Sequence, residues 1–151
     1  MKNLFALRGT THKGKSQTIR TVVELLTQNH PDATIEHNHT TKAEIRIVLT
    51  INGLKIGIDS QSGRLASGSL ALFVNDGCDM IVCATRTSGA AVNAVDALHG
   101  FDIHWFEQPE KSKPYEQILR SLMMARQIVA KVETRIRSAK PALARTMSAS
   151  A

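Results

Sequence analysis

Hydrophobic and polar positions along the chain alternate between two patterns, one typical of buried strands and one typical of amphipathic helices. Short apolar runs at residues 4–7, 80–84 and 101–106 predict strands. Between them, apolar residues recur at helical spacing and are bounded by glycine or proline. The predicted helices cover residues 16–29, 65–75, 90–98 and 114–140.

A β-hairpin is predicted in the middle of the chain. Residues 33–37 and 44–51 have strand character, and the second segment is rich in β-branched side chains. Asn52-Gly53 then separates residues 45–51 from the run at 54–58. An Asn-Gly pair between two such runs favours a tight antiparallel turn.

Strands that alternate with helices predict an α/β fold with a mostly parallel sheet, helices on both faces and one antiparallel hairpin. We expect a single domain over residues 1–140, which is an ordinary domain size. Pro114 suits the first turn of the long last helix, and Pro141 is expected to end it. Residues 141–151 are then expected to form a flexible tail.

Composition excludes several classes of protein. The chain has 151 residues, of which 42% are hydrophobic and 21% charged, so a disordered or fibrous protein is excluded. No apolar run approaches the roughly 18 residues of a membrane span, and the apolar run before Arg8 is too short for a signal peptide. Cys78 and Cys83, the only cysteines, are expected to be buried thiols, and a cytoplasmic location is expected by default.

Positive charge is concentrated in the C-terminal quarter. Residues 111–151 carry nine Lys or Arg side chains against two Glu, whereas the rest of the chain is nearly neutral. This pattern is typical either of a solvated helix or of a surface for an anionic partner, and residues 111–145 could bind an acidic protein or nucleic acid. A 4-3 apolar spacing also allows a homodimer through this helix. The positions are Ile118, Leu122, Ala125, Val129, Val132 and Ile136.

The strongest chemical signal is a glycine-rich segment between the first strand and the first helix. Glycines at both ends of such a loop permit backbone angles that turn several N–H groups toward one point, where they can hold an anion. The positive end of the following helix faces the same point. The segment reads Gly9-Thr10-Thr11-His12-Lys13-Gly14-Lys15-Ser16, a match to G-x-x-x-x-G-K-S at every position.

This segment resembles the Walker A sequence of P-loop NTPases. The resemblance implies a P-loop NTPase-like three-layer α/β/α sandwich that binds ATP, or another nucleoside triphosphate, together with Mg²⁺. It further implies that residues 9–16, with Gln17 after them, hold the nucleotide. Lys15 would reach the outer phosphates, and the Ser16 hydroxyl would bind the magnesium ion.

An acidic residue follows the strand at residues 54–58 and is a candidate second magnesium ligand. Asp59 resembles the Walker B aspartate, which holds the ion directly or through water. The alternative is a carboxylate that serves only as a turn residue. His37 and His39 share a face of an extended segment, but they lack a third ligand at a zinc-like spacing, so no zinc site is expected.

Two polar loops are expected at the edge of the sheet where this site would lie, and each carries an arginine. Arg64 or Arg86 could stabilise the charge that develops on a transferring phosphate, and Gln61 could orient a water molecule. Each could equally be a solvated loop residue. No Asn-Lys-x-Asp sequence follows residues 80–84, where Ras-like GTPases read guanine, so ATP is favoured over GTP.

The sequence therefore favours a P-loop protein that hydrolyses ATP or transfers its terminal phosphate, with Lys15, Asp59, Arg64 and Arg86 as candidate catalytic residues. One alternative is a small nucleotide or metabolite kinase. Another is a regulatory ATP-binding module that docks an acidic partner through its basic last helix. Nucleic-acid binding through that helix is a further alternative.

Overall fold

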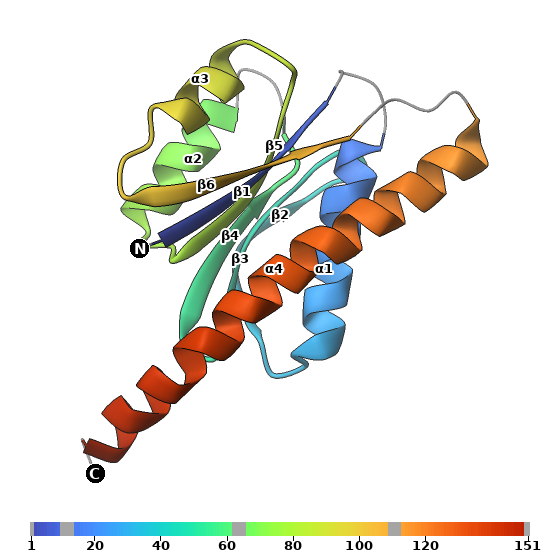
Figure 1. The fold of residues 1–151 in the computed structure, drawn as a ribbon. Coiled ribbons are helices and arrows are strands. Elements are labelled where there is room, and N and C mark those ends of the chain that lie inside the picture. Colours follow the sequence, from blue (N-terminus) through green and yellow to red (C-terminus); the bar gives the residue numbers. More distant parts are fainter. Residues whose placement is uncertain (1, 10–13, 62–65, 109–112, 150–151) are drawn as a thin grey trace.

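Six strands form one sheet at the centre of the molecule. The structure, a computed structural model, describes residues 2–9, 14–61, 66–108 and 113–149 (Figure 1). The strand order is β2-β3-β4-β5-β1-β6. The strands are β1 (Lys2–Arg8), β2 (Thr34–Thr40), β3 (Ile45–Ile51), β4 (Leu54–Asp59), β5 (Met80–Thr85) and β6 (Phe101–Glu107).

The sheet is mixed, because one strand runs against the others. β4, β5, β1 and β6 pair in parallel, whereas β3 is antiparallel to both β2 and β4. Ile51 pairs with Leu54 across the turn, in which Asn52 and Gly53 have φ of 52° and 82°. Two successive positive φ angles give the tight hairpin turn that Asn-Gly favours. The predicted hairpin and the mostly parallel sheet are confirmed.

Helices cover both faces of the sheet (Figure 1). One face carries the N-terminal and C-terminal helices α1 and α4, and the other carries α2 and α3. The alternation of strands and helices is thus that of an α/β fold, as predicted. The helices are α1 (Lys15–Asn29), α2 (Ala66–Asn75), α3 (Ala90–Asp96) and α4 (Pro114–Ala149).

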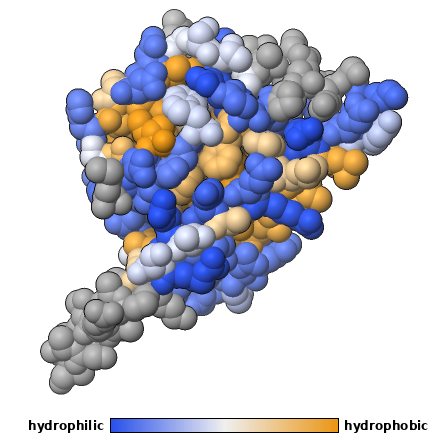
Figure 2. All heavy atoms as spheres, viewed as in Figure 1, coloured by the Kyte–Doolittle hydropathy of each residue, from blue (hydrophilic) through white to orange (hydrophobic). Residues whose placement is uncertain are grey.

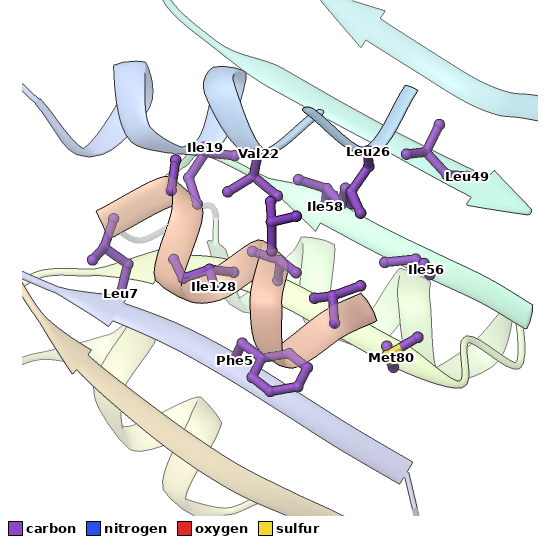
Figure 3. Packing of buried hydrophobic residues seen from close by; sticks show 14 of the residues in the cluster. Phe5, Leu7, Ile19, Val22, Leu26, Leu49, Ile56, Ile58, Met80 and Ile128 are labelled. Carbon is purple, nitrogen blue, oxygen red and sulfur yellow. The ribbon is translucent and has the colours of Figure 1, made fainter. Parts of the chain in front are cut away.

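The larger core lies between the sheet and the helices α1 and α4. Figure 3 shows Ile19, Val22 and Leu26 of α1 pointing toward the sheet beside Ile128 of α4, and all four are fully buried. Their spacing is that of a helix with one apolar face, which explains why α1 packs flat on the strands. This packing fixes the start of α1, where the glycine-rich segment ends.

The last helix is longer than predicted. α4 continues through Pro141 to Ala149, so the predicted helix end at residue 140 is wrong. An interior proline removes one N–H···O bond, but it does not prevent helix formation when good helix formers such as alanine and leucine flank it. The flexibility of residues 141–151 stays a prediction. None of the described helices, α4 included, is long and apolar enough to span a membrane.

Other boundaries shift by a few residues. β2 runs over Thr34–Thr40 rather than 33–37, and its side chains are exposed throughout because it is an edge strand.

The two cysteines are free and buried, as predicted. Burial raises the pKa of the Cys78 thiol to about 11, which makes it a poor nucleophile.

Gly57 of β4 lies directly under the ring of Phe73 from α2. A Cβ atom at position 57 would lie 2.5 Å from that ring. Gly57→Ala is therefore expected to lower the free energy of unfolding by about 1–3 kcal/mol in urea titration. Gly68→Ala is the control, because no atom lies within 4 Å of its added Cβ and alanine favours helix. Equal unfolding midpoints for the two variants would contradict this packing.

Candidate functional site

The glycine-rich segment joins the carboxyl end of β1 to the start of α1. Gly9 directly follows β1, and its N–H donates to the carbonyl of Thr85 at the end of β5, at 3.2 Å. Gly14 then precedes α1, whose first residue is Lys15. The two strand ends and the helix start therefore meet at one edge of the sheet. The candidate nucleotide-binding residues Thr10, Thr11, His12 and Lys13 lie outside the described residues.

The Lys15 side chain folds back over the ends of β1 and β5. Its Nζ donates to the carbonyl oxygens of Gly9 and Thr85, each at 2.8 Å. Only 6% of the residue is exposed. An ammonium group carries three N–H bonds, so a third donor remains for another acceptor.

This buried ammonium lacks a counter-ion in the described part of the chain. No carboxylate of those residues lies within ion-pair distance of Lys15. Burial, with a smaller contribution from the charge of Arg86, lowers the pKa of Lys15 to about 8. Burial of a cation is unfavourable unless an anion compensates it, so the site is electrostatically prepared for an anion.

The start of α1 adds to the same preference. Among the residues that the structure describes, no side chain caps the helix, and the first turn of the helix has no acidic residue. The unpaired N–H groups and the positive end of the helix dipole therefore stay available to an anion. Gly14 has φ of 106°, and a Cβ there would lie 2.6 Å from Nε2 of Gln108, so only glycine fits. Ser16, the second residue of α1, is partly buried.

A buried hydrogen-bond network fixes the backbone of Gly14. Its carbonyl accepts bonds from the N–H of Thr18 at 2.8 Å and from the hydroxyl of Ser121 at 3.1 Å. The Thr18 hydroxyl lies 2.7 Å from both that carbonyl and Oε1 of Gln108, and Nε2 of Gln108 donates to Ser121. The network therefore joins α1, α4 and the end of β6. Gln108 was missed from sequence, although a polar residue just after a strand at this edge was the available signal.

A hollow of about 230 Å³ lies beside Gly14, between the first turns of α1 and α4. Gln17 lines it, together with Gln117 and Ile118 of α4. Most of the surface that lines the hollow is apolar, and the side-chain amides of Gln17 and Gln117 can form hydrogen bonds within it. The candidate residue Gln17 therefore lies next to the loop.

Asp59 lies at the end of β4 and is 1% exposed. Its Oδ1 accepts the N–H of Gln61 at 3.0 Å, whereas its Oδ2 is buried without a hydrogen bond among the described residues. Burial raises the pKa of Asp59, and the N–H of Gln61 and the nearby hydroxyl of Ser69 offset part of this rise. Burial, with a smaller contribution from the charge of Asp59, raises the pKa of the Cys83 thiol to about 12.

The strand order sets the separation between Asp59 and the loop. β5 lies between β4 and β1, which places the two strands about 10 Å apart. No described hydrogen bond or ion pair joins Asp59 to Lys15 or Ser16. Both strands nevertheless end at the same edge of the sheet, because β4, β5 and β1 are parallel.

The remaining candidates differ in their surroundings. Arg86 follows β5, is exposed, and is close enough to lower the pKa of Lys15. Arg64 lies outside the described residues. Gln61 donates its side-chain amide to a carboxylate oxygen of Glu44 at 2.6 Å, so this amide is already engaged.

A second group of possible metal ligands lies away from the loop. Ligand atoms of Glu36, His37 and Asp76 lie within 4.8 Å of one another. The sequence did not reveal this group, because Asp76 is distant from the other two residues along the chain. The ammonium of Lys55 lies 3.2 Å from Asp76 and already neutralises it, so we assign no metal to this group.

Comparison with known proteins gives no match: no family model, no curated protein and no solved structure resembles this chain closely enough to be aligned with it.

The lowered pKa of Lys15 predicts that the contribution of this residue to the free energy of unfolding depends on pH. Between about pH 8 and 10.5 the unfolded chain binds more protons at this residue than the folded chain does. The contribution of Lys15 to the free energy of unfolding therefore rises across this window. In urea titrations, the stability of the wild type minus that of Lys15→Met is expected to increase from pH 8 to 10.5. A constant difference would contradict a lowered pKa.

Proposed function

We propose that the chain binds ATP through residues 9–16 and hydrolyses it or transfers its terminal phosphate. The observation that carries the proposal is the Lys15 ammonium, which is buried and, among the described residues, has no counter-ion and no acceptor for its third N–H. A polyphosphate supplies the missing negative charge. The uncapped start of α1 supports the same ligand, since its N–H groups favour anions.

The nucleoside part of ATP would occupy the hollow beside Gly14. This hollow opens next to the loop and is lined by apolar groups and by the amides of Gln17 and Gln117. Apolar walls suit a planar base, and amide groups can bind its polar edge. This arrangement does not select one base, so the preference for ATP over GTP still rests on the sequence.

Magnesium would be held by Ser16 and Asp59. A hydroxyl and a carboxylate are the hard oxygen ligands that Mg²⁺ prefers. Oδ2 of Asp59 has no hydrogen bond of normal geometry among the described residues, although the Ser69 hydroxyl lies near enough to lower the pKa of this carboxyl. Because β5 separates β4 from β1, Asp59 would act through ordered water. When bound, the ion would neutralise charge on the phosphate oxygens.

Arg86 is the described residue best suited to stabilise charge during phosphate transfer. It is exposed at the end of β5 and influences the pKa of Lys15, so it lies beside the proposed phosphate site. Arg64 is proposed for the same role. Gln61 would have to leave Glu44 before it could orient water. The choice between hydrolysis and transfer to an acceptor, as in a small kinase, depends on whether phosphate acceptors raise ATP consumption.

Isothermal titration calorimetry with Mg²⁺ and ATP tests the binding proposal. We expect saturable binding that requires the metal and weakens by about tenfold or more in Lys15→Ala, because a charge-assisted contact is lost. Since phosphate should raise the lowered pKa of Lys15, binding near pH 8 is expected to take up about half a proton, measured in buffers of different ionisation enthalpy.

Lys131→Ala is the matched control for Lys15→Ala, because Lys131 is an exposed lysine of α4. It should bind ATP like the wild type. Equal affinity in Lys15→Ala and the wild type, or no binding at millimolar ATP, would refute the proposal.

Arg86→Ala separates binding from turnover. We expect the rate of phosphate release to fall at least tenfold while the affinity for ATP changes less than threefold, because the arginine would act on charge that develops only in the transition state. Phosphate release and calorimetry on the same preparation measure both quantities. An unchanged rate would remove Arg86 from the catalytic residues.

A regulatory ATP-binding module is the second candidate, and the surface of α4 favours it. Four large apolar side chains on its first turns are more than half exposed. Figure 2 shows hydrophobic residues at this end of α4 with hydrophilic residues beside them. Such a patch is typical of a docking surface. This candidate predicts ATP binding with no turnover above that of Lys15→Ala. The four residues are Tyr115, Ile118, Leu119 and Met123.

A further inference from the structure

The outer side of α4 carries a row of three large apolar side chains that the rest of the described chain leaves uncovered. Tyr115, Leu119 and Met123 are 59%, 57% and 52% exposed. Their spacing of four residues places them one above the other on the first turns of the helix. The helix itself lies on the outside of the molecule (Figure 1). A contiguous exposed row of this kind marks an interaction surface, unlike apolar residues scattered singly.

This exposed row differs from the 4-3 seam that the sequence indicates for the same helix. Four of the six seam positions are buried in the core against the sheet and α1, where they cannot meet a partner. Since successive residues of an α-helix turn by about 100°, the seam and the exposed row lie on different sides of α4. The surface of α4 that is open to a partner is therefore the exposed row. The four buried seam positions are Ala125, Val129, Val132 and Ile136.

Two opposite charges flank the exposed row, one on each side. At about 100° per residue, Glu116 lies to one side of the line through Leu119 and Met123, and Arg126 lies at a similar angle to the other side. Arg126 is exposed and Glu116 is partly exposed. Neither is in an ion pair among the residues that the structure describes. The level of Ser121 is the midpoint both between the two apolar residues and between the two charges.

This arrangement is complementary to a copy of itself. A two-fold axis through the level of Ser121, perpendicular to the helix, makes two α4 helices antiparallel and places Leu119 against the partner's Met123. The same rotation places Glu116 opposite the partner's Arg126, and it does so twice in one dimer. A strongly acidic partner protein would instead bring like charge against Glu116. The charges that flank the row therefore favour a second copy of this chain.

We propose that two copies of this chain associate through the first turns of α4, as an antiparallel helix pair about a two-fold axis. The apolar row forms the centre of the contact, and Glu116 with the partner's Arg126 forms its rim. Three apolar side chains per copy make a small interface, below the roughly 1,200 Å² of stable complexes, so the dimer is weak and depends on concentration. The association does not depend on ATP, since none of the three lines the hollow beside Gly14.

Sedimentation equilibrium of the full-length chain without nucleotide tests the association. From about 1 to 500 µM, the mass is expected to rise from the 16.5 kDa of one chain toward twice that value, as for a weak interface. The mass of a single chain at every concentration would overturn the proposal. That result would leave ATP binding unaffected, so the two proposals can fail separately.

Charge reversal tests the pairing of the two helices. Glu116→Arg and Arg126→Glu each place like charges opposite one another and are expected to raise the Kd of the dimer by about tenfold or more. The double variant exchanges the two charges and restores the attraction, so its Kd is expected to lie within about threefold of the wild-type value.

Arg137→Glu is the matched control, because Arg137 is an exposed arginine of α4. It lies about 24 Å from the level of Ser121, beyond the start of the partner's α4, and the variant should dimerise like the wild type. Circular dichroism checks that each variant is folded. Equal effects of Arg126→Glu and Arg137→Glu, or a double variant as weak as the single ones, would overturn the assignment.

Discussion

The contact of the Lys15 ammonium with the carbonyls of Gly9 and Thr85 is the constraint on which the candidate site depends. It joins the carboxyl ends of β1 and β5 to the first residue of α1, and it does so with a buried positive charge. Because such a charge is unfavourable without a compensating anion, the folded chain carries an electrostatic imbalance at this point. An anion bound here would stabilise the folded chain. Without one, the favourable packing of the rest of the fold offsets the cost of the buried charge.

Much of the fold could be predicted because its signals are local. Apolar runs predict β1 and β5, and Asn52-Gly53 predicts the β3–β4 turn through the positive φ angles that these two residues tolerate. For the glycine-rich segment the outcome is partial. Gly14 has the positive φ that its glycine permits, whereas Gly9 does not, and residues 10–13 lie outside the described part of the chain. What the sequence could not supply is the state of Lys15, since its two carbonyl partners are six and 70 positions away along the chain.

The features of the site that sequence reasoning missed depend on long-range contacts. Gln108 and Ser121 meet Gly14 only because β6 lies beside β1 and α4 crosses α1. The position of β5 between β1 and β4, which separates Asp59 from the loop, is a property of strand order that periodicity does not encode. The end of α4 was misjudged for a different reason. Pro141 carries a strong local signal, but the helix-forming residues on both sides outweigh it.

The continuity of α4 has a mechanical consequence. Ser121 attaches the helix to the carbonyl of Gly14, and from there the same helix runs without interruption to Ala149. About 42 Å of helix separates Ser121 from Ala149. The buried side chains of α4 as far as Ile136 are packed in the core, so this part of the helix cannot tilt by itself. A rearrangement at Gly14 would therefore reach the far end of α4 only by moving the core with it.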